Sequence, residues 1–276
     1  MTVRLDDQVA IVTGASAGIG RAITRAFVER GAKVAGMARR PEPGAELEAE
    51  LGPAFRFVPG DVTEPVACRR LVEATVDAFG RADVLVNNAG YGLPVNRVED
   101  TTDEDWRAML DANLTSCFNM CRAVLPTMQA QAKGLIVNLS SFAGEQALAY
   151  MAPYAAAKAG LVQLTKVVAV ENRDRGVRAN AVIIGAVPTK QSHDTAREVA
   201  KFLRGPEFVP DREKPIGSFA GVRMSAESVA RTIAALCCDD ASELTGATIA
   251  LDRGFSAGWL SSTLLELVAG QAVDWP

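Results

Sequence analysis

Short apolar runs alternate with longer segments of helical periodicity along the chain. Four to eight apolar residues bounded by glycine or polar residues are typical of buried strands, whereas apolar positions three and four apart indicate helices. Their alternation predicts a parallel sheet with helices on both faces. The predicted strands cover residues 9–12, 33–37, 55–58, 84–86, 135–139, 177–183 and 245–252. We therefore expect an α/β fold in which residues 1–276 form a single domain around a doubly wound parallel sheet.

The turn after the first predicted strand is rich in glycine. It reads Thr13-Gly14-Ala15-Ser16-Ala17-Gly18-Ile19-Gly20 and leads into a predicted helix. Gly14 permits a tight exit from the strand, Gly18 lets the backbone approach a pyrophosphate, and Gly20 allows close packing of helix on sheet. The amino end of the helix offers N–H groups and a positive dipole to phosphates. The turn predicts a dinucleotide site, with a plain flexible turn as the alternative.

A second group of polar residues follows the fifth predicted strand. Ser141 ends that strand, and thirteen residues later Tyr154 opens a helix that carries Lys158 one turn on. Residues four apart share a helix face, so the phenol and the ammonium project into the same space. A nearby cation favours the phenolate, which would let Tyr154 act as an acid or base. Tyr-x-x-x-Lys alone is common in helices, and only its combination with the strand and Ser141 points to catalysis.

In these motifs the chain resembles the short-chain dehydrogenase/reductase family. The shared features are the order strand, Ser, Tyr-x-x-x-Lys, the turn Thr-Gly-x-x-x-Gly-x-Gly, and the tetrapeptide Asn87-Asn88-Ala89-Gly90, all within residues 5–254. The resemblance implies a Rossmann-type sheet of seven strands in the order 3-2-1-4-5-6-7. It implies that Asn113 kinks its helix and holds a water behind the lysine. The implied catalytic residues are Asn113, Ser141, Tyr154 and Lys158.

The same resemblance implies how the cofactor is held. Asp61 would accept a hydrogen bond from the adenine, although an Asx turn that caps the next helix explains this residue nearly as well. Asn87 is expected to be mainly architectural. The expected cofactor-binding residues are Gly14, Ser16, Gly18, Ile19, Gly20, Arg39, Arg40, Asp61, Val62, Asn88, Ala89, Gly90, Tyr154, Lys158, Gly185, Val187 and Thr189.

The segment after the sixth predicted strand departs from the family pattern. Ile184 stands where the family usually has proline, so the conformation of the turn is not predicted. Gly185 is kept for a close approach to the nicotinamide. Val187 would bond the carboxamide through its backbone, and Thr189 would reach the pyrophosphate. After the last strand, Arg253 stands where glycine is common.

The end of the second predicted strand indicates which dinucleotide is bound. An acidic residue there would hydrogen-bond the ribose 2′-hydroxyl, whereas arginine accommodates a 2′-phosphate. The strand leads into Ala38-Arg39-Arg40, and residues 33–41 contain no Asp or Glu. Arg39 can hold a phosphate through its planar fork, with Arg40 as a secondary candidate. The predicted cofactor is NADP(H).

Composition argues against several other classes. The 276 residues carry a net charge of -4, without the basic footprint of a nucleic-acid binder. The five cysteines form no C-x-x-C pair and His193 is the only histidine, so we expect buried reduced thiols, no metal, and His193 on a surface helix. Neither a leader nor an apolar run of membrane-spanning length is evident, so a cytoplasmic protein without membrane contact is expected.

Other segments suggest contacts beyond the core. The helix that begins near Tyr154 is apolar almost all round, so we expect a second subunit to cover it, together with the helix that holds Asn113, in a homodimer or homotetramer. That second helix is expected to be capped by Asp103 and to carry mostly core residues. These are Trp106, Met109, Leu110, Leu114 and Phe118.

Two segments are expected near the substrate. Residues 188–224 loosen into proline, glycine and charged residues with scattered aromatics, which suggests a substrate lid. The apolar C-terminal extension, residues 255–276, would either pack across a subunit interface or wall the substrate pocket.

The expected activity is NADP(H)-dependent interconversion of a ketone or aldehyde and a secondary or primary alcohol, as in a carbonyl reductase of small molecules. As the resemblance implies, Ser141 would polarise the carbonyl, Tyr154 would transfer the proton, and Lys158 would assist the tyrosine and hold the ribose. One alternative is a reductase of 3-oxoacyl thioesters of acyl carrier protein or CoA. Leu135 follows Gly134 where a basic residue would be expected for the carrier protein, so half of the expected basic pair is missing, although Arg175 could supply the other half. The second alternative is a catalytically silent NADP(H)-binding regulator.

Overall fold

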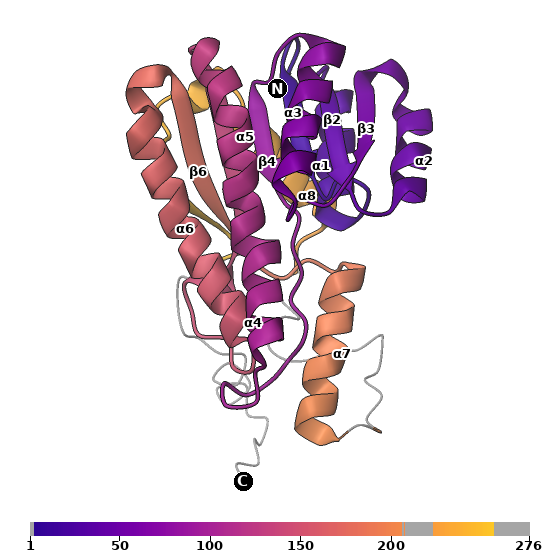
Figure 1. The fold of residues 1–276 in the computed structure, drawn as a ribbon, viewed down its shortest axis with the longest axis vertical. Helices are drawn as coiled ribbons and strands as arrows, with labels where there is room; N and C mark the ends of the chain where they lie inside the picture. Colours follow the sequence, from indigo (N-terminus) through magenta and orange to yellow (C-terminus); the bar gives the residue numbers. More distant parts are fainter. Residues whose placement is uncertain (1–2, 206, 208–222, 257–276) are drawn as a thin grey trace, which may run out of the picture.

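The fold is a seven-stranded parallel sheet with helices on both faces (Figure 1). The computed structural model describes residues 3–205, 207 and 223–256. The strand order β3-β2-β1-β4-β5-β6-β7 confirms the order implied by the resemblance. The strands are β1 (Val9–Thr13), β2 (Lys33–Ala38), β3 (Phe55–Pro59), β4 (Val84–Asn87), β5 (Gly134–Ser141), β6 (Val177–Ile184) and β7 (Thr248–Leu251).

The helices form a layer on each side of the sheet. In Figure 1, α3, α5 and α6 lie in front of the strands, whereas α1 and α8 pack against each other behind them. The helix α7 leaves the sheet and extends beyond the carboxyl ends of the strands. The α-helices are α1 (Gly18–Glu29), α2 (Pro41–Leu51), α3 (Pro65–Phe79), α4 (Asp103–Leu110), α5 (Ser116–Ala130), α6 (Ala152–Asn172), α7 (Lys190–Arg204) and α8 (Ala226–Leu236).

Each face of the sheet has its own apolar core. Phe27 of α1 and Ile233 of α8 are fully buried on one face, and Leu71 of α3 and Met120 of α5 are fully buried on the other. Every residue of β5 is buried, because a central parallel strand is covered on both faces. This is why the strands appear in the sequence as continuous apolar runs.

Two expectations about the helix that holds Asn113 are wrong. Thr102 caps α4, since its Oγ1 accepts a hydrogen bond from the backbone N–H of Asp105 at 3.0 Å. Trp106 and Phe118 are 41% and 43% exposed. These two aromatic side chains therefore face outward, and a single sequence does not distinguish an outward apolar position from one in the core.

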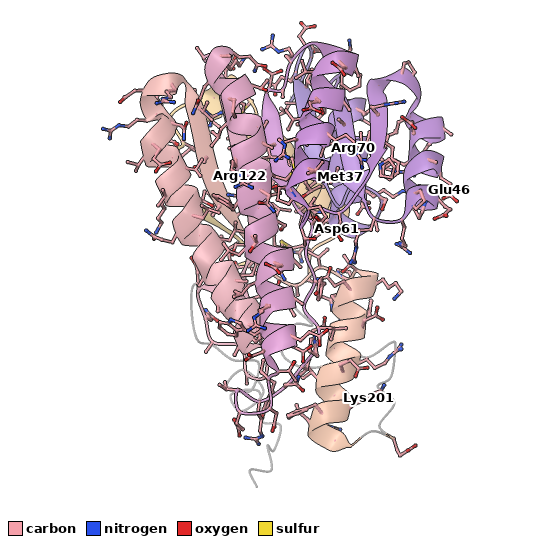
Figure 2. The ribbon with its side chains drawn as sticks, viewed as in Figure 1. Met37, Glu46, Asp61, Arg70, Arg122 and Lys201 are labelled. Carbon is pink, nitrogen blue, oxygen red and sulfur yellow. The ribbon has the colours of Figure 1, made fainter. Side chains whose placement is uncertain are left out.

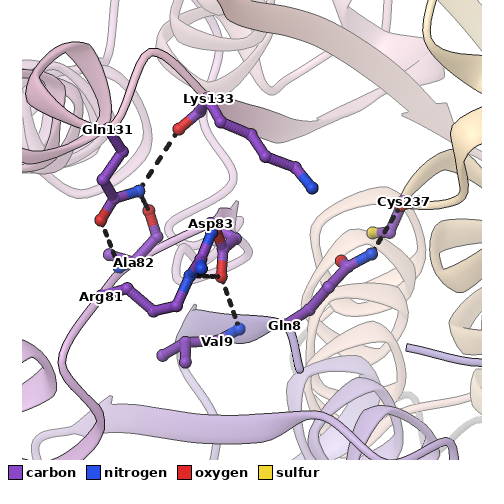
Figure 3. Close-up of polar contacts among 8 residues, drawn as sticks. All are labelled: Gln8, Val9, Arg81, Ala82, Asp83, Gln131, Lys133 and Cys237. Carbon is purple, nitrogen blue, oxygen red and sulfur yellow. Dashed lines mark hydrogen bonds and ion pairs between the residues drawn. The ribbon is translucent and has the colours of Figure 1, made fainter. Parts of the chain in front are cut away.

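The amino edge of the sheet is held by a buried carboxylate (Figure 3). Asp83 accepts hydrogen bonds from Nε and Nη2 of Arg81 at 2.8 and 2.6 Å, and from the backbone N–H of Val9 at 2.9 Å. The hydrogen bond with Asp83 raises the pKa of Arg81. These contacts join the starts of β1 and β4, at the edge opposite the candidate site.

Only part of the expected lid and tail is described. The lid contains α7, where His193 is exposed on a helix as expected. The expected lid residues 206 and 208–222 and the tail residues 257–276 lie outside the described residues. Within the described chain, no helix is long and apolar enough to cross a membrane, and no group of three or more His, Cys, Asp or Glu could hold a metal ion.

Candidate active site

The expected cofactor and catalytic residues gather at the carboxyl edge of the sheet. The glycine turn follows β1, Asn88 follows β4, Ser141 ends β5, and Tyr154 and Lys158 lie in the first two turns of α6. The strand order reverses direction between β1 and β4, and such a switch point opens a crevice where open α/β sheets bind ligands.

The glycine turn is shaped so that side chains cannot replace its glycines. A Cβ on Gly20 would lie 2.2 Å from the Gly14 carbonyl oxygen, and one on Gly14 would lie 2.8 Å from Nδ2 of Asn88. Gly14 and Gly18 also have φ of +67° and +51°. The α1 amino terminus has no side-chain cap and no acidic residue in its first turn, so its N–H groups and dipole face the crevice unopposed. These features fit a bound pyrophosphate.

Thr13 organises this turn, a role that the sequence reasoning missed. Its Oγ1 accepts hydrogen bonds from the backbone N–H groups of Asn88 and Ala89, both at 3.0 Å. The Asn88 side chain returns a hydrogen bond to the Thr13 carbonyl oxygen at 2.9 Å. The amide of Asn88 therefore links the ends of β1 and β4, and Ala89 and Gly90 follow it along the crevice. The available signal was a polar residue at the last position of an otherwise apolar strand.

Asn87 has the architectural role expected of it. Its Nδ2 donates to Oδ1 of Asn138 in β5 at 2.8 Å, and Nδ2 of Asn138 donates to Oγ1 of Thr165 in α6 at 2.8 Å. This buried chain of side chains joins β4 to β5 and β5 to the helix that carries Tyr154.

Arg39 and Arg40 are exposed directly after β2. No ion pair with another described residue engages either guanidinium. The turn after β1 lies beside the end of β2, because the N–H of Gly14 donates to the Met37 carbonyl oxygen at 2.8 Å. Arg39 is therefore placed close to the glycine turn with its donors available.

Asp61 forms the Asx turn that was the alternative explanation of this residue. Its Oδ1 accepts hydrogen bonds from the backbone N–H and the hydroxyl of Thr63, both at 2.9 Å. A Cβ on Gly60, the residue before Asp61, would lie 2.9 Å from Met37 Cε, and Figure 2 labels both Met37 and Asp61 in this part of the molecule. The turn occupies one carboxylate oxygen of Asp61 and is compatible with adenine contact by the other.

Lys158 is held in place by the backbone of β5. The side chain is 6% exposed, and Nζ donates to the Leu139 carbonyl oxygen at 3.0 Å. Nζ lies 5.7 Å from the centroid of the Tyr154 ring. The two residues share one helix face, as their spacing predicted.

Asn113 lies inside a π-helical turn, Asp111–Thr115, between α4 and α5. Its Nδ2 donates to the carbonyl oxygens of Tyr91 and Met109 at 2.9 and 3.0 Å, whereas its buried Oδ1 has no partner among the described residues. A Cβ added to Gly90 would lie 2.4 Å from this Oδ1 and 3.6 Å from Lys158 Nζ. The free acceptor and the ammonium therefore border the same small space, as a proton relay between them would need.

The two adjacent serines at the end of β5 have different hydrogen-bond partners. Oγ of Ser141 accepts a hydrogen bond from the Ala143 N–H at 3.2 Å, so its own proton can be donated to a ligand. Oγ of Ser140 donates to the Lys158 carbonyl oxygen at 2.9 Å and fixes α6 against β5. The sequence reasoning did not assign this positioning role to Ser140.

Gly185 has a structural reason to be glycine in addition to the expected approach to the nicotinamide, which stays a prediction. A Cβ there would lie 2.7 Å from Cβ and 2.8 Å from Cα of Asp252, and its N–H donates to the Leu251 carbonyl oxygen at 3.0 Å. Ile184 continues β6 in register with Leu251. Arg253 has φ of +55°, which explains why glycine suits that position.

Thr189 lies across the crevice from the glycine turn. Its Cγ2 would be 3.4 Å from a Cβ on Gly18. Its Oγ1 caps α7 by accepting from the Ser192 N–H at 3.2 Å, which leaves its hydroxyl proton for a phosphate oxygen. Val187, also assigned to the cofactor, is buried two residues earlier.

Four of the five free cysteines are buried, as expected, and Cys238 is partly exposed. Burial raises the pKa of Cys68 to about 11. Burial also raises the pKa of Cys117, although the nearby Lys158 charge opposes the change. Both side chains therefore remain protonated thiols at neutral pH.

Comparison with known proteins decides the family. A model described as short chain dehydrogenase matches residues 8–200. The chain belongs to the short-chain dehydrogenase/reductase family. It is therefore an oxidoreductase that acts on alcohol and carbonyl groups, and its family uses NAD(P)(H).

Relatives of this dehydrogenase/reductase have several substrates. A 3beta-hydroxysteroid dehydrogenase of Mediterraneibacter gnavus is 33% identical over 92% of this chain and 96% of its own length. The 3-oxoacyl-acyl-carrier-protein reductase FabG of Escherichia coli is 33% identical over 91% of this chain and 98% of its own. A solved levodione reductase aligns with a TM-score of 0.83 at 29% identity, covering 93% of this chain and all of that one.

Proposed function

We propose that this dehydrogenase/reductase uses NADP(H) to interconvert a ketone or aldehyde and an alcohol, with Tyr154 as the general acid and base. The observation that carries the proposal is Lys158. Its buried ammonium is fixed by the Leu139 carbonyl oxygen and lies beside the Tyr154 ring, at the end of a strand that also presents the Ser141 hydroxyl.

The residues of the chain have complementary roles in reduction. The nicotinamide, when bound, supplies the hydride. Ser141 donates a hydrogen bond to the carbonyl oxygen and stabilises the negative charge that develops there. Tyr154 donates the proton to the same oxygen, and the Lys158 charge stabilises the phenolate that remains. Asn113 Oδ1, beside Lys158, supports a proton path back to solvent.

NADP(H) is favoured over NAD(H) by the charges after β2. Arg39 and Arg40 are exposed without carboxylate partners among the described residues, and an arginine fork suits a 2′-phosphate. The supporting observation is that no acidic residue lies between Lys33 and Pro41 to accept a hydrogen bond from the ribose 2′-hydroxyl.

The experiment is a pair of NADPH and NADH binding titrations, followed by turnover assays with a panel of ketones, aldehydes and 3-oxoacyl thioesters. We expect tighter binding of NADPH and reduction of at least one carbonyl class. Equal binding of the two nucleotides would overturn the cofactor proposal. Binding without turnover of any panel member would favour a silent regulator.

A 3-oxoacyl-thioester reductase remains the second candidate, because FabG proteins are among the relatives. Leu135 is buried in β5 and offers no surface charge to an acyl carrier protein, whereas Arg175 is exposed. This candidate would be favoured if the protein reduced the 3-oxoacyl thioesters of CoA and of acyl carrier protein much faster than simple ketones.

We further propose a homodimer or homotetramer in the cytoplasm. Phe118 on α5 and Val167 and Val170 on α6 are 43%, 43% and 64% exposed, which is unusual for large apolar side chains on neighbouring helices. A second subunit would cover them. The unpaired thiols support a reducing compartment.

A further inference from the structure

Three segments meet at one tyrosine near the catalytic helix. Tyr150 lies between Ser141 and Tyr154, and its ring centroid is 4.8 Å from that of Phe202 in the last turn of α7, at an interplanar angle of 47°. The guanidinium carbon of Arg97, from the segment after β4, lies 5.9 Å from the Tyr150 centroid. Lys201 marks this end of α7 in Figure 2, remote from the sheet. The aromatic pair therefore ties the distal end of α7 to the site.

The backbone of Tyr150 is unusual for such a residue. Its φ is +68°, in the left-handed region that aromatic residues rarely adopt. The Asn96 N–H holds it by donating to the Tyr150 carbonyl oxygen at 2.9 Å, and the next residue, Met151, accepts from the Ala155 N–H at 2.9 Å as α6 begins. Conformations of this kind persist where the surroundings determine them, and they concentrate at functional sites.

The other end of α7 is anchored near the cofactor turn. Thr189 caps the helix and lies beside Gly18. In the middle of the helix, Thr195 Oγ1 lies 3.5 Å from the position that a Cβ on Gly92 would take, and Met151 Cε lies 2.9 Å from the same point. The helix thus runs from the cofactor turn, past Met151, to the aromatic pair.

The distal half of α7 buries little of its own surface among the described residues. Ala200, at 4% exposed, is the one buried residue of the whole helix, and Leu203 is 58% exposed. A segment with little buried apolar surface opens locally at low cost. Loss of the aromatic contact with Tyr150 should then change how often the distal half is in place, by a factor of about 3 to 10.

We propose that Tyr150 and Phe202 form an aromatic latch that fixes α7 relative to Tyr154 and so sets the size of the substrate site. Tyr150 is a positioning residue. Because Tyr150 is four residues from Tyr154, a substrate bound between α7 and the catalytic hydroxyl would be held there only while the latch is closed. For substrate recognition, the inference rests on the proposed carbonyl reductase function, whereas the latch itself does not.

Hydrogen exchange of α7 amides in the full-length protein, with NADPH present, tests the latch without turnover. We expect Tyr150→Ala and Phe202→Ala each to lower protection over residues 196–204 by about 3- to 10-fold, with the double variant no worse than either alone. Tyr150→Phe keeps the ring and should leave protection unchanged. Leu203→Ala removes an exposed apolar side chain from the same helix and is the matched control, so it should also leave protection unchanged.

Tyr150→Gly separates the ring from the strained backbone. Glycine relieves the left-handed conformation, so thermal stability should not fall, yet protection of α7 should drop as in Tyr150→Ala. Unchanged protection in Tyr150→Ala, or an equal loss in Leu203→Ala, would overturn the latch.

A kinetic split tests the effect on substrates. With NADPH saturating, we expect Tyr150→Ala to raise the KM for cyclohexanone by about 3- to 10-fold and to change kcat much less, with NADPH affinity unchanged. An equal loss of kcat for cyclohexanone and acetone would contradict a role in setting pocket size. A wild-type protein that reduces no carbonyl would refute the proposed function but leave the exchange result standing.

Discussion

At the scale of single residues, the proposed preference for NADP(H) depends on a cation without a carboxylate partner among the described residues. Arg39 is exposed immediately after β2, and the glycine turn is bonded to the last residues of the same strand. The sequence predicted this placement because strand ends are well marked by composition. It did not reveal that Thr13 supports the turn, since a threonine at a strand end has several ordinary explanations.

Arg39→Ala should weaken NADPH binding by about 1.5–3 kcal/mol, the scale of a hydrogen bond to a charged group, and leave NADH binding little changed. Ala38→Asp should go further and move preference toward NADH, because a carboxylate repels the 2′-phosphate and accepts from a free ribose hydroxyl. Fluorescence titrations with both nucleotides measure these changes. Arg40→Ala is the matched control and should have the smaller effect. Equal weakening of NADPH and NADH by Arg39→Ala would contradict the assignment.

Other residue assignments show the limit of sequence reasoning. Asp61 was assigned to adenine with an Asx turn as alternative, and the structure contains that turn. The close approach of Gly185 to the nicotinamide stays a prediction, whereas the sequence did not reveal that the atoms a side chain there would meet belong to Asp252, sixty-seven residues later in the chain. Contacts between distant segments leave no periodic signal, so they were not predictable.

At the scale of elements, the strands were predictable because a covered parallel sheet requires continuous apolar runs, whereas their order was implied by the family resemblance. The helix α7 was harder to see in the sequence, since it is mostly polar and buries one residue. The π-helical turn at Asn113 was expected only as a kink. The Asn113 side chain donates hydrogen bonds to the backbone of Met109 on its own helix and of Tyr91 in the segment after β4, and the second partner could not be predicted from helical spacing.

The turn after β7 makes stability depend on pH. Asp252 is buried and accepts hydrogen bonds from the N–H groups of Gly254 and Ser256 at 2.9 and 2.8 Å. Burial alone would raise the pKa of Asp252, but hydrogen bonds with Ser256, Gly254 and Phe255 together lower it below its ordinary value. The stability from a carboxylate with a lowered pKa is present above the unfolded pKa, near 3.9, and is lost as pH falls through the folded pKa.

Asp252→Asn should therefore lower the free energy of unfolding at pH 7 by about 1.5–3 kcal/mol. The difference from wild type should shrink below about pH 4, where Asp252 of the unfolded wild-type chain begins to take up a proton while the folded chain does not. Urea unfolding over a pH series measures both effects. Asp240→Asn, at an exposed position, is the control and should change little. A difference that stays constant with pH would contradict the account.

At the scale of the whole molecule, the outward apolar surface on α5 and α6 predicts self-association. Val170 lies on the helix that was expected to contact a second subunit, and Phe118 was expected on the helix that holds Asn113, at the same contact. Both side chains are exposed in the single chain. Phe118→Asp combined with Val170→Asp should shift the protein toward monomers in sedimentation velocity. Val66→Asp, at an equally exposed site on α3, should not. A wild-type protein that sediments as a monomer at micromolar concentration would refute the oligomer.

The central claim is that Tyr154 transfers the proton while Lys158 and the crevice hold NADP(H). Its most direct test is the rate of carbonyl-dependent NADPH oxidation by Tyr154→Phe, measured beside the NADPH dissociation constant of the same variant. Loss of general acid catalysis should lower turnover by about 10²–10⁴-fold. NADPH affinity should stay within about twofold, because the glycine turn, Arg39 and Lys158 remain in place. Near-normal turnover in Tyr154→Phe would contradict the account.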